Sequence, residues 1–317
     1  MQRMTNRNDI AEAAARFQSG RAPGLVRETP LFKLPGAAFD IPCKEIWLKL
    51  EHLQTSGSFK ARGMLNRLLA NDIPESGVIA ASGGNAGIAT AAAAKALGVK
   101  CEVFLPTISS PAKQAKLREL GAHVVVTGDA FADALQACIK RQQETGALMT
   151  HAYDQPEVVA GAGTLAREIE QQGGLPDSVL VSVGGGGLIA GIAAWFEGRS
   201  RVVALEPELA PTLYRAREAG QPVDVSVSGI AADSLGARRI GAIAWEVTQQ
   251  HVKDALLLPD DAIRAAQLWL WKEMKLAVEP AAALGLAALQ SGAYRPRPDE
   301  TVCLVICGAN LDPASLS

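Results

Sequence analysis

The stretch SVLVSVGGGGLIAGIAAWF (178–196) joins an apolar run, four consecutive glycines and a second apolar run. It carries no charge and is nearly as long as the ~20 apolar residues that cross a bilayer. However, four glycines in succession would break a helix exposed to lipid. The pattern therefore predicts a buried β-strand, a glycine loop and an α-helix within a globular protein, and no membrane partner.

A glycine loop between a strand and a helix suits an anionic ligand. Glycine lets the backbone approach the ligand closely, and the helix N-terminus offers free N–H groups and a favourable dipole. The alternative is a tight turn that binds nothing. We favour a phosphate or pyrophosphate bound by Gly184, Gly185, Gly186 and Gly187.

Apolar and amphipathic runs alternate along the whole chain. Strands are predicted at 45–50, 77–82, 101–106, 123–128, 147–152, 178–183, 201–207 and 301–308. Helices are predicted at 87–98, 110–121, 133–146 and 260–274. This alternation indicates an α/β fold with parallel sheets covered by helices on both faces. We expect a small domain at 55–153 and a large domain made of 1–54 and 154–317.

Charge and composition favour a small-molecule ligand. The 317 residues include 31 basic and 33 acidic ones, which gives a net charge of −2 without a run of like charges. This balance argues against a nucleic-acid or membrane-surface partner. The five cysteines form no CxxC pair, and the polar start MQRMTNRNDI does not resemble a secretory signal. A cytoplasmic protein is expected.

The glycine loop also permits a different interpretation. Gly185, Gly187 and Ala190 fit the dinucleotide pattern G-x-G-x-x-A, and Glu206 ends the next strand about 20 residues on. An NAD-dependent oxidoreductase is therefore an alternative. Four glycines in a row satisfy several registers of this pattern at once, so the match is weak. It also leaves two further motifs unexplained.

The first of these motifs is ASGGNAGIA (81–89), a second glycine-rich loop that precedes a predicted helix. Its exposed N–H groups would suit a carboxylate, such as that of an amino acid. Asn85 adds an amide that could bond a phenolic oxygen. The alternative is a helix cap followed by a turn.

The second motif is SGSFKARG (56–63), in which Lys60 follows Phe59. A lone lysine is usually a surface charge. Its amine can, however, condense with a carbonyl once it is deprotonated. A phosphate loop, a carboxylate loop and a lysine beside an aromatic ring together indicate a phosphorylated aldehyde cofactor that acts on an amino acid.

These motifs resemble blocks of the serine/threonine dehydratases, which are fold-type II pyridoxal-phosphate enzymes with a tryptophan synthase β-like fold. The resemblance covers nearly the whole chain. Its blocks are ETPLFKL (28–34), SGSFKARG (56–63), SGGNAG (82–87), YDQPEVVAGAGTLAREI (153–169), VGGGGLIAGI (183–192), ALEPELA (204–210), VEPAAALGLAAL (278–289) and CGAN (307–310).

The resemblance implies a role for each motif. Lys60 would form the Schiff base with pyridoxal phosphate and later act as the general base, with Phe59 beside the cofactor ring. Asn85 would bond the ring hydroxyl, and Cys307 would face the pyridine nitrogen. The four glycines would hold the phosphate. The substrate carboxylate would lie among Ser82, Gly83, Gly84 and Ala86.

The implied activity is β-elimination from L-serine, L-threonine or a related β-hydroxy amino acid, which yields a 2-oxo acid and ammonia. A thiol holds a pyridinium less firmly than a carboxylate, so Cys307 favours prompt elimination over a long-lived carbanion. Racemases of this fold have a serine where Gly83 stands, and β-replacing synthases have TSGNTG-like loops in place of SGGNAG. Both remain alternatives, as does a non-catalytic binding module.

Other features are implied more weakly. Thr212 stands where the racemase divalent site has an acidic residue, so Glu206 and the Ala210 carbonyl would suit a monovalent cation such as K⁺ better. Little sequence follows CGAN, so a catabolic enzyme without a C-terminal regulatory module is expected. A homodimer is also expected. Side-chain specificity would lie in segments 109–114, 153–164 and 230–239.

Overall fold

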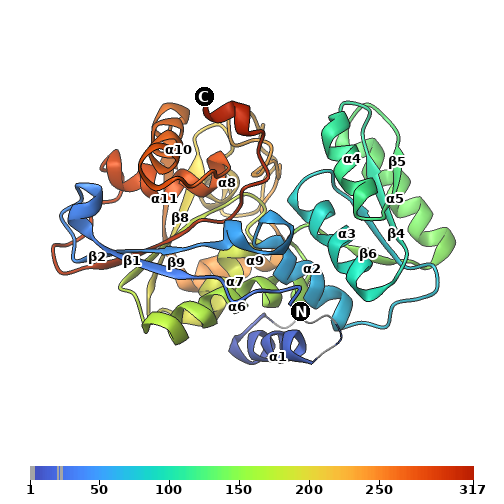
Figure 1. The fold of residues 1–317 in the computed structure, drawn as a ribbon, viewed down its shortest axis with the longest axis horizontal. Coiled ribbons are helices and arrows are strands. Elements are labelled where there is room, and N and C mark those ends of the chain that lie inside the picture. The colour runs from blue at the N-terminus through green and yellow to red at the C-terminus, as the bar shows by residue number, and fades with distance from the viewer. Residues whose placement is uncertain (1–3, 20, 22–23) are drawn as a thin grey trace.

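The computed structural model describes residues 4–19, 21 and 24–317. Residues 1–3, 20, 22 and 23 of the predicted large domain therefore lie outside the described residues. The chain forms two lobes, each built around its own β-sheet, with helix α2 between them (Figure 1). The predicted α/β class with two parallel-sheet-based domains is confirmed.

The larger lobe contains a six-stranded sheet with the order β1-β2-β10-β7-β8-β9. β1 pairs with β2 antiparallel, and the other neighbours are parallel. The carboxyl ends of the central strands therefore meet at one edge, where ligands bind in open α/β sheets. The strands are β1 (Leu31–Pro35), β2 (Glu45–Lys49), β7 (Ser178–Ser182), β8 (Arg201–Pro207), β9 (Val252–Leu258) and β10 (Thr301–Val305).

The smaller lobe contains a parallel four-stranded sheet with the order β5-β4-β3-β6. Its strands are β3 (Val78–Ala81), β4 (Cys101–Leu105), β5 (His123–Val126) and β6 (Leu148–Thr150). Three helices accompany this sheet, close to the bounds that the sequence predicts. They are α3 (Asn85–Leu97), α4 (Pro111–Glu119) and α5 (Phe131–Thr145).

Helices cover both faces of the larger sheet, with α10 and α11 on one side and α6 and α7 on the other (Figure 1). None of the described helices is long and apolar enough to cross a membrane. The remaining helices are α1 (Arg7–Gln18), α2 (Lys60–Leu69), α6 (Pro156–Gly173), α7 (Gly187–Phe196), α8 (Thr212–Ala219), α9 (Ala242–His251), α10 (Asp260–Met274) and α11 (Pro280–Gln290).

The strand predictions omit the two edges of the larger sheet. β1 is largely exposed and ends in a proline, so it lacks the apolar pattern of a central strand. β9 follows α9 directly, and no turn residue separates His251 from Val252. Without such punctuation, residues 242–258 do not divide visibly into a helix and a strand.

Helix α2 packs very closely against α6 of the larger lobe. A Cβ added to Gly161 would lie 2.5 Å from the Arg62 carbonyl oxygen, and one added to Gly63 would lie 2.8 Å from the Val158 carbonyl oxygen. Only glycine permits this approach. Helix α2 therefore packs tightly against the larger lobe, although it falls within residues 55–153. The exact domain boundary stays a prediction.

Candidate active site

The loop that carries Lys60 is held at the carboxyl end of β10. Ser58 forms an isolated β-bridge with Gly308, and the Phe59 N–H donates to the Cys307 carbonyl at 3.0 Å. Gly57, at φ +76°, makes the turn that allows this pairing. Lys60 then begins α2, so its backbone position is set from both the sheet and the helix.

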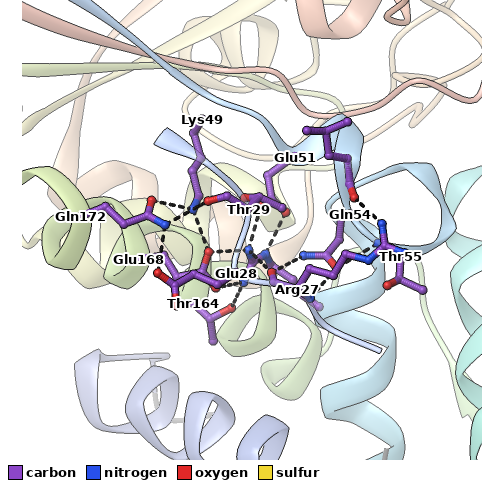
Figure 2. Close-up of polar contacts among 12 residues, drawn as sticks. Arg27, Glu28, Thr29, Lys49, Glu51, Gln54, Thr55, Thr164, Glu168 and Gln172 are labelled. Carbon is purple, nitrogen blue, oxygen red and sulfur yellow. Dashed lines mark hydrogen bonds and ion pairs between the residues drawn. The ribbon is translucent and has the colours of Figure 1, made fainter. Parts of the chain in front are cut away.

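Helix α2 is anchored by a buried ionic cluster, part of which is drawn in Figure 2. The Arg62 guanidinium pairs with Glu51 at 2.7 Å and with Glu168 of α6 at 2.6 Å. Lys49 of β2 pairs with Glu168 at 2.7 Å and also donates to the Thr29 carbonyl at 2.7 Å. The positive charges of Lys49 and Arg62 balance the negative charges of Glu51 and Glu168. Because Arg62 lies two residues after Lys60 in α2, this cluster also fixes the position of Lys60.

The Lys60 amine lies in a desolvated site. It donates to the Ala152 carbonyl at 2.5 Å and lies 5.1 Å from the centroid of the Phe59 ring. Burial lowers its pKa to about 8, against the opposing influence of Cys307 and Glu279. An amine with this pKa is neutral in roughly a tenth of the molecules at pH 7, and a nucleophile or base has to be neutral.

The tetraglycine loop lies between β7 and α7, as the sequence predicts. A Cβ on Gly185 would lie 2.2 Å from the Tyr153 ring, and one on Gly187 would lie 2.8 Å from the Tyr153 carbonyl oxygen. Gly186 adopts φ +88°. In the described part of the chain, the N–H groups of these three glycines have no protein acceptor. The loop thus offers an anion free donors at a helix N-terminus.

The segment after β6 holds this loop in place. Asp154 accepts from the Ala242 and Ile243 N–H groups at 2.9 and 3.0 Å, which caps α9. The preceding Gly241 N–H donates to the Gly185 carbonyl at 3.0 Å. Tyr153 and the glycine loop are therefore parts of one rigid arrangement.

The second glycine loop lies between β3 and α3 and contains Ser82, Gly83 and Gly84, and Ala86 follows in the first turn of α3. A Cβ on Gly87 would lie 1.8 Å from the Ser82 carbonyl oxygen, so only glycine fits there. Asn85 is the first residue of α3. Among the described residues, the N–H groups of 83–87 donate to no protein acceptor, which leaves them available to an anion.

Cys307 follows β10 and is only 4% exposed. Burial, together with the nearby Glu279 carboxyl, raises the pKa of this thiol far above its usual range. The side chain is therefore a neutral thiol at physiological pH.

One cavity brings most of the predicted site residues together. It also contains residues to which the sequence assigned no role, above all Glu279 and Tyr153. The blocks VEPAAALGLAAL and YDQPEVVAGAGTLAREI contain them, but a polar residue beside a helix is usually only a cap. The lining residues are Phe59, Lys60, Asn85, Tyr153, Ser182, Gly184, Gly185, Gly186, Gly187, Leu188, Ser234, Leu235, Glu279, Ala281 and Cys307.

Glu206 lies apart from this lining and serves helix α8. Its carboxyl oxygens accept from the Leu213 N–H at 2.7 Å, the Tyr214 N–H at 2.8 Å and the Thr212 hydroxyl at 3.0 Å. The Ala210 carbonyl accepts from the Thr212 N–H at 3.2 Å. In the described part of the chain, no group of three or more His, Cys, Asp or Glu side chains could hold a metal. A cation at Glu206 and Ala210 stays a prediction.

Comparison with known proteins decides the family. Residues 23–308 match the model of the pyridoxal-phosphate dependent enzyme family. The chain belongs to this family. The match favours pyridoxal phosphate over a dinucleotide as the ligand of the glycine loop. The surroundings of Glu206 agree, because its side chain is fully buried and its carboxyl oxygens accept from α8.

Relatives within this pyridoxal-phosphate family include lyases. An L-threonine ammonia-lyase of Geobacter sulfurreducens is 37% identical over 86% of this chain and 69% of its own length. The phenylserine dehydratase of Ralstonia pickettii is 35% identical over 92% of this chain and 90% of its own.

Two solved structures of family members have the same fold. The T.th. threonine deaminase has a TM-score of 0.88 at 34% identity and covers 97% of this chain and 99% of its own. Maize serine racemase has a TM-score of 0.91 at 28% identity and covers 99% of this chain and 96% of its own. The predicted fold-type II architecture is confirmed.

The cavity fits the cofactor of this family. The glycine loop offers free N–H donors for a phosphate, and Lys60 offers an amine of lowered pKa for an aldehyde. Phe59 offers an aromatic face and Asn85 an amide for the ring, and Cys307 offers a neutral thiol for the ring nitrogen. The clearest sign is the tetraglycine loop, because the N–H groups of Gly185, Gly186 and Gly187 have no protein acceptor among the described residues.

Proposed function

We propose that this protein is a pyridoxal-phosphate-dependent lyase that eliminates the β-hydroxyl of L-serine, L-threonine or a related amino acid. The products would be a 2-oxo acid and ammonia. The observation that carries the proposal is the Lys60 amine, whose pKa burial lowers to about 8, in one cavity with the tetraglycine loop and Cys307. The lyases among the relatives support the same activity.

In this proposal each part of the cavity has its own task. When bound, pyridoxal phosphate supplies the electron sink that makes the α-proton of the amino acid acidic. The N–H groups of Gly184, Gly185, Gly186 and Gly187 would hold the phosphate, and Phe59 would contact the ring. Lys60 would hold the aldehyde, and its amine would accept the α-proton of the substrate.

The second loop and the thiol complete the assignment. N–H groups of the loop that contains Ser82, Gly83 and Gly84, together with that of Ala86, would bind the substrate carboxylate at the N-terminus of α3. Cys307 would face the pyridine nitrogen as a neutral thiol, because its pKa is raised. A neutral partner does not enforce a charged ring, which favours elimination over a persistent carbanion.

Finer features are proposed on the resemblance and the composition alone. They are a domain boundary at 55–153, a K⁺ ion at Glu206 and Ala210, a homodimer and a cytoplasmic location. For the substrate, we consider β-hydroxy amino acids from threonine to the aromatic phenylserine, because one relative is an L-threonine ammonia-lyase and another a phenylserine dehydratase.

The test measures ammonia and 2-oxo acid release from L-serine, L-threonine, 3-hydroxyaspartate and phenylserine. Turnover of at least one of these, lost in Lys60→Ala, is expected. Turnover that survives in Lys60→Ala would remove Lys60 from its role. A protein that releases no ammonia from any of them would not be this lyase.

A racemase is the second candidate, because serine racemases are among the relatives and the solved structures. Gly83 has no side chain to act as a second base, and Leu105 lies 3.0 Å from the position of its absent Cβ. The Ser109 hydroxyl, however, lies 3.7 Å from that position. Chiral chromatography of the serine that remains after partial turnover separates the two activities, and a lyase leaves no D-serine.

A further inference from the structure

Glu279 is a buried carboxyl group in the cofactor cavity that has no part in the proposed reaction. It is the N-cap residue of α11, but its side chain makes no capping hydrogen bond to that helix. Instead, both of its carboxyl oxygens accept from Asn85 Nδ2 at 3.0 Å. Gly308 leaves room for this arrangement, since a Cβ there would lie 2.3 Å from Glu279 Oε2. The carboxyl is thus directed at Asn85.

Asn310 holds the other end of the same amide. Its Nδ2 donates to Asn85 Oδ1 at 2.6 Å and to the Ser56 carbonyl at 2.8 Å. A backbone carbonyl can only accept, so Asn310 has to present its NH₂ group on this side. Asn85 Oδ1 then faces a donor, and Asn85 Nδ2 faces an ionised carboxylate, which also can only accept.

These contacts determine what Asn85 offers to the cavity. An amide has one carbonyl oxygen and two N–H donors. The oxygen is taken by Asn310 and one N–H by Glu279, which leaves the second N–H for the cavity that Asn85 lines. The reversed amide would place its oxygen against the carboxylate and its NH₂ group against another NH₂ group. Both encounters are unfavourable.

We propose that Glu279 and Asn310 are positioning residues that keep Asn85 a hydrogen-bond donor toward the cofactor. The proposal rests on the proposed function, since the ring oxygen of pyridoxal phosphate is the acceptor that this donor serves. An N–H donor favours the anionic form of that oxygen, because hydrogen bonding to the charged form stabilises it. The two residues therefore control the ionisation of the cofactor, and with it the colour of the enzyme.

The arrangement depends on the charge of Glu279. Burial raises the pKa of this carboxyl to about 7, and Asp233 acts in the same direction, whereas Asn85, Asn310 and Lys113 act against it. Glu279 in turn raises the pKa of Lys60 and of Cys307. When the pH falls through about 7, the carboxyl gains a proton, becomes a donor itself, and no longer requires the NH₂ group of Asn85.

A double-mutant cycle on cofactor binding tests the proposal. Dissociation constants of pyridoxal phosphate are measured for the wild type, Asn310→Ala, Asn85→Ala and the double variant. Asn310→Ala is expected to weaken binding about fivefold to tenfold, as the loss of one positioning hydrogen bond implies. In the Asn85→Ala background the same change is expected to have no further effect. An equal loss in both backgrounds would overturn the proposal.

The absorbance spectrum of the holoenzyme gives a second, independent readout. The wild type is expected to lose its long-wavelength band as the pH falls through about 7, and Glu279→Gln is expected to lack this transition. A transition that persists unchanged in Glu279→Gln contradicts the proposal. This readout also decides the matter if Asn310→Ala does not fold.

Two controls separate the possible failures. Glu300 is also a buried glutamate, 2% exposed, but it lies directly before β10 and bonds Ser178 of β7 and Tyr294, which follows α11. Glu300→Gln is expected to lower stability and leave the spectrum unchanged. A spectral change as large as that of Glu279→Gln would count against a specific role for Glu279. A wild type that binds no pyridoxal phosphate would instead refute the proposed function itself.

Discussion

Replacing Glu51 by glutamine is predicted to cause a large loss of stability. Arg62 and Glu51 are both fully buried and share two hydrogen bonds, of 2.8 Å and 2.7 Å. The change removes one of two negative charges and places a glutamine amide beside the guanidinium. The cluster then carries two cations, Lys49 and Arg62, against the single carboxylate of Glu168.

The expected magnitude follows from the burial. Removing one partner of a buried ion pair leaves an uncompensated charge and lowers the free energy of unfolding by about 3–5 kcal/mol. The exposed pair of Arg215 and Glu218, with half of each side chain accessible, provides the matched control. Glu218→Gln is expected to cost about 0–1 kcal/mol. Urea unfolding at pH 7, followed by circular dichroism, gives both values.

The same pair gives a pH dependence with a defined sign. Burial alone would raise the pKa of Glu51, but the charge and hydrogen bonds of Arg62 outweigh it and lower the pKa. Because the folded pKa lies below the unfolded one, this stabilisation is present above the unfolded pKa and disappears as the pH falls through the folded pKa. A Glu51→Gln variant within about 1 kcal/mol of the wild type at pH 7 would refute the reasoning.

Three further predictions concern the cavity. Gly185→Ala is expected to weaken pyridoxal-phosphate binding about tenfold or more, because its Cβ would lie 2.2 Å from the Tyr153 ring; absorbance titration of the apoprotein measures this. The rate at which the apoprotein takes up pyridoxal phosphate is expected to rise with pH through about 8, since only the neutral Lys60 amine can attack the aldehyde, and a flat profile would contradict this. Cys307→Ser is expected to fold and turn over substrate, whereas Cys307→Asp, which adds a buried charge beside Glu279, is expected to lose about 3–5 kcal/mol of stability in urea.

Local patterns predicted the parts of the site that depend on backbone geometry. Both glycine loops lie between a strand and a helix, because close approach to neighbouring atoms leaves only glycine at positions such as Gly87 and Gly185. Lys60 was placed by combining three motifs, and the structure brings its amine into the cavity with one of the glycine loops. Such requirements are local, so the residue types of a short segment are enough to predict them.

Polar contacts between residues far apart in the sequence could not be predicted from local patterns. Asn85 and Glu279 are 194 residues apart, and Arg62 and Glu168 are 106 apart. Each partner taken alone has the appearance of an ordinary surface charge or a helix cap. Only the folded chain shows that Glu279 and Arg62 are buried and what they contact. The edge strands β1 and β9 were missed for local reasons, because β1 is largely exposed and no turn residue separates β9 from α9.

The central claim is that Lys60 holds pyridoxal phosphate in this cavity. The most direct measurement is borohydride reduction of the purified protein, followed by mass spectrometry of its peptides. The yellow colour is expected to bleach, and the reduced cofactor is expected on the peptide that contains Lys60, with no label in Lys60→Ala. A colourless protein, or a cofactor fixed to another lysine, would contradict the account.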